Sequence, residues 1–449
     1  MSIPATDGIV VERPSPLAVT ATRSRAFPLL IFALTFGLLL SDYMSRQVLS
    51  AVFPFLKVEW ALTDTQLGAL TSVVSLTVGL LAVPLSLLGD RWGRSKAIVA
   101  MAILWSLATL GSALAANYQQ MMLARFLVGL GEAAYGSVGL AVVLMVFAPS
   151  KRASLAGAFM AAGSFGSVVG VFFGGVLAVR LGWRWSFGVM AIVGLVLVAL
   201  YALLVTDAKV ARHQHPGNLR DETQAVATKR APLRTLVSTP SVICAYLGGG
   251  LQLFVAGTLF AWMPSFLGRA YHLRPDKAGI AAAGFIMLMA VGMIVCGVVT
   301  DWLSLDTPTR KWTTGIVYAA LSLLLLTLGF AQVPGKAQLL LIAVGTFFAA
   351  GTTGPITAMV ANLTPASIRA TAFGTLTLAN NVLGMAAGPV VTGVLADRLG
   401  LQGAMQVVPL ISVLVIVALV VGRRAYPSSL RRVGAHAGTD VHVSEGGPA

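Results

Sequence analysis

Charge is scarce in this chain of 449 residues, and the scarcity excludes a soluble globular protein. Asp, Glu, Lys and Arg together make up 10% of the residues, whereas soluble domains carry about 25%. Apolar residues make up 57%, and apolar runs long enough to cross about 30 Å of hydrocarbon recur along the chain. Because a backbone exposed to lipid must satisfy its own hydrogen bonds, we expect every crossing segment to be a helix.

Cysteine and histidine are also rare. The two cysteines, Cys244 and Cys296, both fall within apolar segments, so neither a disulfide framework nor a metal site is indicated. The five histidines all lie in polar stretches between or outside these segments. A membrane enzyme would need clustered histidines, an Asp-rich metal site or a Ser–His pair near the interface. We therefore expect no enzyme activity, no cofactor and no metal.

Acidic residues are outnumbered by basic ones, 16 against 31, which gives a net charge of +15. The basic residues are concentrated in the expected loops and tails on the side of both termini. This asymmetry predicts a multi-pass protein of the cell (inner) membrane with both termini in the cytoplasm. The basic excess thus indicates topology and phospholipid contact rather than nucleic-acid binding. Residues 1–26 are polar and the first apolar run is too long for a signal peptide, so we expect no cleaved leader.

Hydropathy predicts twelve membrane-spanning helices. The expected spans cover residues 27–55, 65–88, 96–115, 119–148, 153–179, 185–205, 240–268, 277–300, 312–331, 337–363, 370–396 and 403–422. The long polar stretch 206–239 divides them six and six. The expected domains are an N-tail (1–26), an N-terminal six-helix bundle (27–205), a cytoplasmic linker (206–239), a C-terminal six-helix bundle (240–422) and a C-tail (423–449).

The two halves resemble each other internally. Gly175-Val-Leu-Ala-Val-Arg-Leu-Gly182 closes the fifth expected span, and Gly393-Val-Leu-Ala-Asp-Arg-Leu-Gly400 closes the eleventh. The starts of the same two spans also match, at Arg152 and Arg369. These similarities predict two parallel six-helix pseudo-repeats in an all-α membrane protein, with a site near the bilayer midplane where the repeats meet.

Four charged residues lie well inside the expected spans, away from their ends: Asp42 and Arg46 in the first, and Arg125 and Glu132 in the fourth. A charge at a helix centre costs about 2.5–3.5 kcal/mol on insertion scales. Residues four or seven apart share one helix face, so each pair lies on a single face, and Asp42 can pair with Arg46. Both carboxylates are expected at one depth, with both guanidiniums slightly further out. Charges retained at this cost are typical of a water-filled path through the membrane.

These four charges suggest roles in binding and proton transfer. Arg46 stays charged and offers a planar fork, so we expect it to bind an anionic group of a substrate. Glu132 is the first candidate for proton coupling and Asp42 the second. Arg125 is expected to orient Glu132 through an ion pair or to gate the outer side. The alternative interpretation is a salt-bridge cluster that only ties the two helices together.

In the second half, the one charge within the bounds of an expected span is Lys277 at the very start of its span, and the polar candidates are amides. Gln252, Asn380 and Asn381 are expected to donate into the cavity, together with Tyr43 of the first half. One charged and one apolar half favour an amphipathic ligand with its head group at Arg46. Residues 248–250 are all glycine and could break the seventh span, and residues 351–355 could bend the tenth. Close helix packing through small residues is the alternative explanation for these glycines.

The loop after the second span reads Gly89-Asp90-Arg91-Trp92-Gly93-Arg94-Ser95-Lys96. Gly93 permits a tight turn, Asp90 can cap the next helix, and the basic residues hold the loop in the cytoplasm. The loop resembles the signature loop of the major facilitator superfamily. The resemblance implies a twelve-helix transporter whose two bundles rock about a central cavity. It also implies that Asp90 and the loop arginines, Arg91 and Arg94, latch the bundles together in the outward-facing state.

Two further segments are similar to narrower families. Asp42-Tyr43-Met44-Ser45-Arg46 and Arg125-Phe-Leu-Val-Gly-Leu-Gly131-Glu132-Ala133 resemble motifs of Spinster-like transporters and of anion:cation symporters. The first family handles lysolipids and sphingolipid phosphates, and the second moves sugar acids and other organic anions with protons. Ser45 stands where those families have an acid. The resemblance implies a proton-coupled secondary active transporter, working as a symporter and a monomer, for a small organic anion or an amphipathic anionic metabolite.

A drug/proton antiporter that exports hydrophobic or cationic compounds is the alternative. Antiporters of that kind carry a glycine and proline pattern in the fifth span, and here Val171 replaces the proline. The eleventh span carries a fuller version of the pattern, and the glycines that match the fifth-span pattern are Gly166, Gly170, Gly174 and Gly175. A receptor that binds without transporting is a further alternative.

Overall fold

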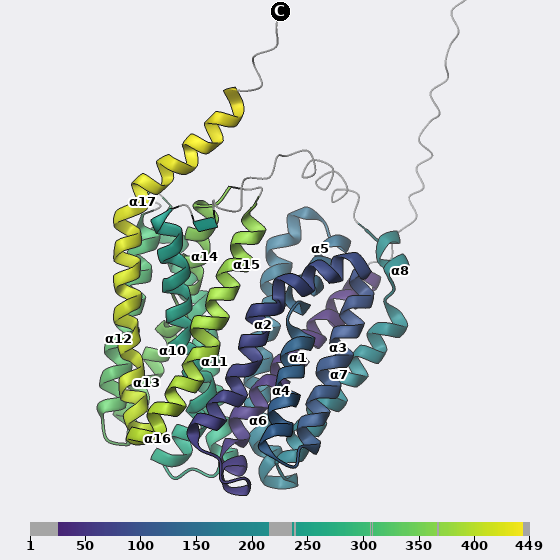
Figure 1. The fold of residues 1–449 in the computed structure, drawn as a ribbon, viewed down its shortest axis with the longest axis vertical. Coiled ribbons are helices and arrows are strands. Elements are labelled where there is room, and N and C mark those ends of the chain that lie inside the picture. The colour runs from purple at the N-terminus through teal and green to yellow at the C-terminus, as the bar shows by residue number, and fades with distance from the viewer. Residues whose placement is uncertain are drawn as a thin grey trace, which may run out of the picture.

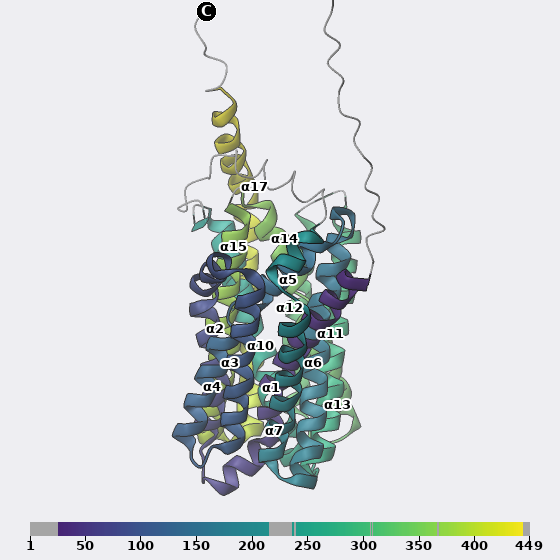
Figure 2. The ribbon, with the colours of Figure 1, turned by 90° about the vertical axis from the view of Figure 1, so that its right-hand side faces the viewer.

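The computed structural model describes residues 26–214, 236–237, 239–305, 307, 309–365 and 368–442, and this part of the chain is almost entirely helical. The helices run roughly parallel to one axis and form two side-by-side groups (Figures 1 and 2). We call the end that carries Ala26 and the described end of the last helix the tail end, and the opposite end the far end. This arrangement confirms the predicted all-α membrane fold.

The first group crosses from end to end six times. Its helices are α1 (Ala26–Glu59), α2 (Asp64–Trp92), α3 (Arg94–Leu114), α4 (Tyr118–Glu132), α5 (Tyr135–Val146), α6 (Arg152–Leu181) and α7 (Trp183–Leu204), with the short 3₁₀ turn Pro149–Lys151 before α6. Helices α4 and α5 together make one crossing. The expected span 119–148 is therefore broken at Ala133 and Ala134, directly after Glu132.

The second group repeats this plan. Its elements are α10 (Pro240–Ala270), α11 (Pro275–Leu303), α12 (Arg310–Ala331), α13 (Lys336–Ala349), α14 (Thr353–Asn362), α15 (Arg369–Ala379), the π-helix η4 (Asn380–Ala386), α16 (Ala387–Val407), the 3₁₀ turn η5 (Val408–Leu410) and α17 (Ile411–His442). Helices α13 and α14 form the tenth crossing, with its break at residues 350–352. The predicted bend near Gly351 is thus confirmed.

The last two crossings join without a loop. Eleven helices of the described chain are long and apolar enough to cross a membrane, and the last runs from Thr371 to Arg432. Gly400 interrupts this run with φ 72°, and two helices meet there at a kink. Because glycine has no Cβ, it adopts this left-handed conformation without strain. The kink divides the run into two crossings, which gives the expected twelve.

Three glycines predicted to break the seventh span do not do so. Helix α10 continues through residues 248–250 from Pro240 to Ala270. A Cβ at Gly250 would lie 2.7 Å from the carbonyl oxygen of Ala379. These glycines therefore let α10 approach the eleventh crossing closely, which is the packing explanation rather than the helix break.

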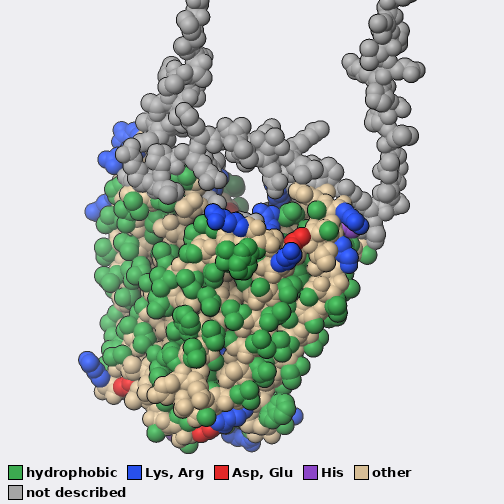
Figure 3. Space-filling view, turned by 45° about the vertical axis from the view of Figure 1, so that its right-hand side comes forward, with side chains coloured by type: hydrophobic (Ala, Val, Ile, Leu, Met, Phe, Trp, Pro, Cys, Tyr) green, Lys and Arg blue, Asp and Glu red, His purple; other side chains and the backbone are tan. Residues whose placement is uncertain are grey.

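The most extensive contacts between the two groups are made at two helix crossings. Helix α2 packs against α16 and η4, and α6 packs against α11. In the space-filling view, apolar side chains cover the middle of the molecule, while lysine and arginine side chains gather at its two ends (Figure 3). Helix α8 (Asp207–Arg212) lies in the expected linker, whose residues 215–235 and 238 are outside the described residues. The predicted domain boundaries remain a prediction.

Candidate functional site

A cavity of about 560 Å³ lies between the two groups of helices. Its walls combine the buried charges of the first group with apolar side chains from α1, α2 and α6. It extends from Asp42 and Glu132 toward Ser86 and Thr371, which lie near the tail end. A cavity of this size is typical of small-molecule sites. Five of the residues predicted for the site line it: Asp42, Tyr43, Arg46, Glu132 and Asn381.

The central contact of the cavity is an ion pair between α1 and α4. Arg46 Nε lies 3.3 Å from Glu132 Oε1, and the side chains are 16% and 2% exposed. Arg46 Nη2 also donates to Ser75 Oγ of α2 at 2.9 Å. The guanidinium lies over the Tyr43 ring, 5.6 Å from its centroid. Among the described residues, Arg46 Nη1 has no hydrogen-bond or ion-pair partner, so it remains available to a ligand.

Two glycines before Glu132 place this carboxylate. A Cβ at Gly129 would lie 2.8 Å from the carbonyl oxygen of Val74, and one at Gly131 would lie 2.7 Å from the backbone nitrogen of Trp105. Such contacts are too close for any side chain, so glycine allows α4 to pack directly on α2 and α3. Helix α4 then ends at Glu132. The glycines of the α4 motif therefore hold its acid against α1.

Asp42 and Glu132 form a pair of buried carboxyl groups. They are 3% and 5% exposed, and both line the cavity. Apart from the Arg46 ion pair, Asp42 Oδ1 and both Glu132 oxygens find no hydrogen-bond donor in the described structure. The expected Asp42–Arg46 pair is not among the ion pairs of the described residues.

Arg125 is built into the helix packing. It is 0% exposed, donates from Nη1 to the Ser45 carbonyl oxygen at 3.2 Å and donates from Nη2 to Ser112 Oγ at 2.7 Å. Its guanidinium lies 4.9 Å from the centroid of the Phe187 ring. The expected ion pair with Glu132 does not occur among the described residues. Arg125 instead ties α4 to α1, α3 and α7.

The second group of helices lines the cavity with one face of the eleventh crossing, formed here by α15 and the start of η4. Its lining residues, all within the described range, are Thr371, Phe373, Gly374, Thr377 and Asn381. Asn381 Nδ2 donates to the Thr377 carbonyl oxygen at 3.0 Å. A π-helix begins at Asn380, and π-helices are frequent at functional sites. Of the three amides predicted to reach the cavity, only Asn381 lines it.

The other two predicted amides lie elsewhere. Gln252 is buried and donates from Nε2 to the carbonyl oxygen of Ala349 at 2.9 Å, which is the last residue of α13. This bond satisfies a carbonyl left open where the tenth crossing breaks. Asn380 faces α10, since a Cβ on Gly249 would lie 3.0 Å from Asn380 Oδ1. Both amides serve contacts within the second group.

The signature loop lies at the tail end. Gly89, Asp90 and Arg91 belong to the last turns of α2, and the side chain of Asp90 lies outside the described residues. Gly93 has φ 99° and separates α2 from α3. The first turn of α3 is capped by Asp207, whose Oδ1 accepts from the Ser95 backbone nitrogen at 2.8 Å. Arg94 Nη1 contacts Met145 Sδ at 2.9 Å.

A second polar cluster at the far end was not anticipated from the sequence. Asp64, which begins α2, bonds Lys57 of α1 and Arg269 of α10. Asp397 of α16 bonds the first turn of α2. Charges at span ends are common, so composition gives no signal here. The one available signal is the internal repeat, in which Asp397 stands where the first half has Val179.

Comparison with known proteins assigns the chain to a family. The family model of the Major Facilitator Superfamily matches residues 35–382. A probable L-galactonate transporter of Escherichia coli is 28% identical over 305 residues, covering 67% of each chain. Human protein spinster homolog 1 is 27% identical, covering 82% of this chain and 73% of its own. The hexuronate transporter of Bacillus subtilis is 23% identical, covering 89% of this chain and 96% of its own.

The fold also matches solved structures. The crystal structures of a bacterial homolog of the human lysosomal transporter Spinster superpose with TM-scores of 0.79 (inward-facing, occupied) and 0.77 (inward-facing, unoccupied). Each match covers 90% of this chain and 99% of the other, at 18% identity. At this identity the likeness establishes the fold alone.

Proposed function

The chain belongs to the Major Facilitator Superfamily, and from this premise we propose that it is a proton-coupled secondary transporter of a small organic anion. The family model covers most of the chain, and the named relatives are transporters rather than enzymes. The observation that carries the proposal is the Arg46–Glu132 ion pair on the wall of the central cavity.

Arg46 is the proposed anion-binding group. Its Nε and Nη2 atoms hold Glu132 and Ser75, while Nη1 has no partner in the described structure. A guanidinium binds a carboxylate best through two parallel hydrogen bonds. A substrate carboxylate can therefore compete with Glu132 for this fork. Tyr43 and Asn381 line the same cavity and are proposed as hydrogen-bonding partners for the rest of the substrate.

Competition at Arg46 provides a route to coupling. When Glu132 takes up a proton, its ion pair with Arg46 is lost and the guanidinium becomes available to an anion. When the anion leaves, Arg46 again favours the ionised form of Glu132, and the proton is released. Asp42, beside Glu132, is the proposed second proton site. Substrate and proton would then bind and leave together, as symport requires.

The names of the relatives favour a sugar acid within the class of organic anions. Two of them are named as L-galactonate and hexuronate transporters. The basic residues near the tail end favour a cytoplasmic location of that end, and we propose an inner-membrane protein in an inward-facing state. The glycines that resemble an antiporter motif have a packing role, since Gly166 and Gly170 bring α6 against the α1 backbone. They therefore give no separate support to drug export.

The test is a thermal-shift and uptake comparison on the purified protein. Hexuronates, lysophospholipids and cationic drugs are added in turn, and hits are tested for uptake into proteoliposomes with an inward proton gradient. We expect stabilisation and uptake with the sugar acids, both lost in Arg46→Ala. Arg46→Lys is the matched variant, which keeps the charge but not the fork, and it should bind roughly 10-fold more weakly. Stabilisation by cationic drugs alone would contradict the proposal and support the antiporter.

A further inference from the structure

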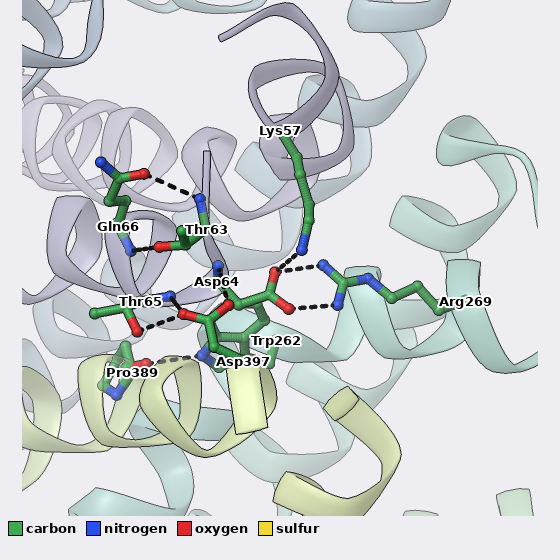
Figure 4. A network of polar contacts seen from close by, with 9 residues as sticks. All are labelled: Lys57, Thr63, Asp64, Thr65, Gln66, Trp262, Arg269, Pro389 and Asp397. Atoms are coloured by element: carbon green, nitrogen blue, oxygen red, sulfur yellow. Dashed lines mark hydrogen bonds and ion pairs between the residues drawn. The ribbon is translucent and has the colours of Figure 1, made fainter. Parts of the chain in front are cut away.

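The far-end cluster joins the two groups of helices through a buried carboxylate. Asp64 is 3% exposed although it begins α2 at the rim of the molecule. Lys57 Nζ donates to its Oδ1 at 2.6 Å. From the other group, Arg269 donates through Nη1 to Oδ2 at 2.7 Å and through Nη2 to Oδ1 at 2.6 Å (Figure 4). The bidentate fork is the strongest geometry available to an Arg–carboxylate pair.

A second carboxylate also forms hydrogen bonds between the two groups. In this case the acid belongs to the second group and the donors to the first. Asp397 of α16 accepts from the backbone nitrogens of Asp64 and Thr65 at 2.8 and 2.9 Å, and from Thr65 Oγ1 at 2.6 Å (Figure 4). The next backbone nitrogen, that of Gln66, donates to Thr63 Oγ1. The open N–H groups of the first turn of α2 are therefore satisfied, two of them by the other group. A carboxylate there also meets the positive end of the helix dipole.

Close backbone packing holds these groups in register. A Cβ on Gly68 would overlap the carbonyl oxygen of Pro389, and one on Gly393 would overlap that of Asp64. Helices α2 and α16 therefore touch through their backbones directly beside the polar cluster. The bonds of Asp64 and Asp397 cannot persist if this crossing separates.

The pseudo-symmetric crossing, α6 on α11, lacks these polar bonds. Gly175 and Gly279 again bring the backbones together, since a Cβ on Gly175 would lie 2.9 Å from the Pro275 carbonyl oxygen. However, Val179 stands at the position of Asp397, and α11 begins with Pro275, which has no N–H to cap. Among the described residues, these four make no hydrogen bond or ion pair across the crossing.

We propose that Asp64, Arg269 and Asp397 form a one-sided latch that keeps the far end closed. The bonds of Asp64 to Arg269 and of Asp397 to Asp64 and Thr65 have to break when the far end opens. The Lys57–Asp64 bond lies within the first group and can persist. The α6–α11 crossing loses no polar bond and remains in contact as the edge about which the groups separate. Opening is therefore expected to widen the α2–α16 edge more than the α6–α11 edge. This inference does not depend on the substrate.

Opening of the latch can be measured with a cysteine introduced at Ser265, a buried position beside it. Ser265 is 2% exposed and lines a pocket of about 290 Å³ that also includes Lys57 and Arg269. After replacement of Cys244 and Cys296, Ser265→Cys is the single thiol. Its labelling rate with a maleimide is measured in the full-length protein without substrate. We expect Asp64→Asn and Asp397→Asn each to raise the rate roughly tenfold, because charge-assisted hydrogen bonds are lost.

Glu59→Gln is the matched control. Glu59 lies at the same end and pairs with Arg184 at 2.9 Å, but both residues belong to the first group of helices. Its neutralisation should leave the labelling rate unchanged. Thr65→Val, which removes one hydrogen bond to Asp397, is the milder variant if Asp64→Asn does not fold, and should raise the rate about threefold. An unchanged rate in the folded latch variants, or an equal rise in Glu59→Gln, would overturn the latch.

The prediction that the far end opens more at the α2–α16 edge than at the α6–α11 edge is tested by distances between pairs of spin labels. Spin labels at Ala61 and Arg398 report on the α2–α16 edge, and labels at Leu181 and Lys277 report on the α6–α11 edge. In Asp397→Asn, the distance distribution at the first edge should gain a longer component that is much weaker at the second. Equal widening at both edges would overturn the pivot while the labelling result decides on the latch separately.

Discussion

The molecule contains two clusters of buried charge that are built in different ways. At the far end, both Asp64 oxygens receive hydrogen bonds from cations and Asp397 satisfies the start of α2. In the central cavity, Asp42 Oδ1 and both Glu132 oxygens have no hydrogen-bond donor among the described residues, and the ion pair with Arg46 alone holds Glu132. A buried polar group without a partner costs about 1–3 kcal/mol. The satisfied cluster is suited to holding one conformation, and the unsatisfied cluster to exchanging protons and ligand.

The largest effect on transport is expected when the central acid, Glu132, is neutralised. Glu132→Gln should abolish accumulation driven by a proton gradient while leaving exchange of substrate across the membrane intact, because the amide cannot take up the proton. Uptake and counterflow in the same proteoliposomes measure both. Asp64→Asn is the control from the other cluster and should retain coupling. Accumulation that persists in Glu132→Gln would remove Glu132 as the coupling acid.

Substitution of Arg125 tests whether a charge in the membrane interior can serve stability rather than transport. Both of its terminal nitrogens are hydrogen-bonded, while its buried Nε has no partner among the described residues. Each such bond to a charged group is worth about 1.5–3 kcal/mol. Arg125→Met should therefore lower the free energy of unfolding by ~3 kcal/mol, measured as a lower melting temperature. Substrate affinity of the folded fraction should change little. A normal melting temperature with lost transport would instead favour the gating role suggested by the sequence.

A smaller effect is expected on the neutral wall of the cavity. Asn381→Ala should raise the KM about three- to tenfold, the effect of losing one neutral hydrogen bond. Asn380→Ala is the neighbouring control, and because that amide faces α10 it should lower thermal stability without changing the KM. The same change of KM in both variants would show that the wall acts only through packing.

The smallest effect is expected for an exposed pair. Arg184 and Glu59 have side chains that are 45% and 39% exposed, and such pairs contribute about 0–1 kcal/mol. Glu59→Gln should therefore leave transport and melting temperature close to those of the unaltered protein. A marked loss of either would show that the far end depends on more than the bonds between the two groups.

The sequence predicts the fold and the residues at the centre of the site through two simple signals. Long apolar runs predict crossing helices, and a charge such as Arg46 or Glu132 inside a run is conspicuous. The pairing of these charges was less accessible. Spacing on one helix suggested that Arg46 would meet Asp42 and Arg125 would meet Glu132, whereas the packing of α4 on α1 pairs Arg46 with Glu132.

The remaining differences depend on tertiary contacts that no single segment reveals. Gln252 was expected in the cavity, but its amide reaches Ala349 because the tenth crossing breaks there. Three consecutive glycines suggested a break in α10, whereas they accommodate the neighbouring backbone of Ala379. Asp64 begins a helix at the rim, where acids are ordinary. Only its partners on α1, α10 and α16 distinguish it from other acids.

The narrow contribution of the second group to the cavity has an evolutionary consequence. The described residues from that group that line the cavity all lie between Thr371 and Asn381. Substitutions along this one stretch can alter the shape and polarity of an entire wall without disturbing Arg46, Glu132 or the far-end contacts. Relatives with unlike cargoes could thus diverge by a few exchanges on a single helix, and directed evolution for a new cargo would begin with saturation of Thr371, Thr377 and Asn381.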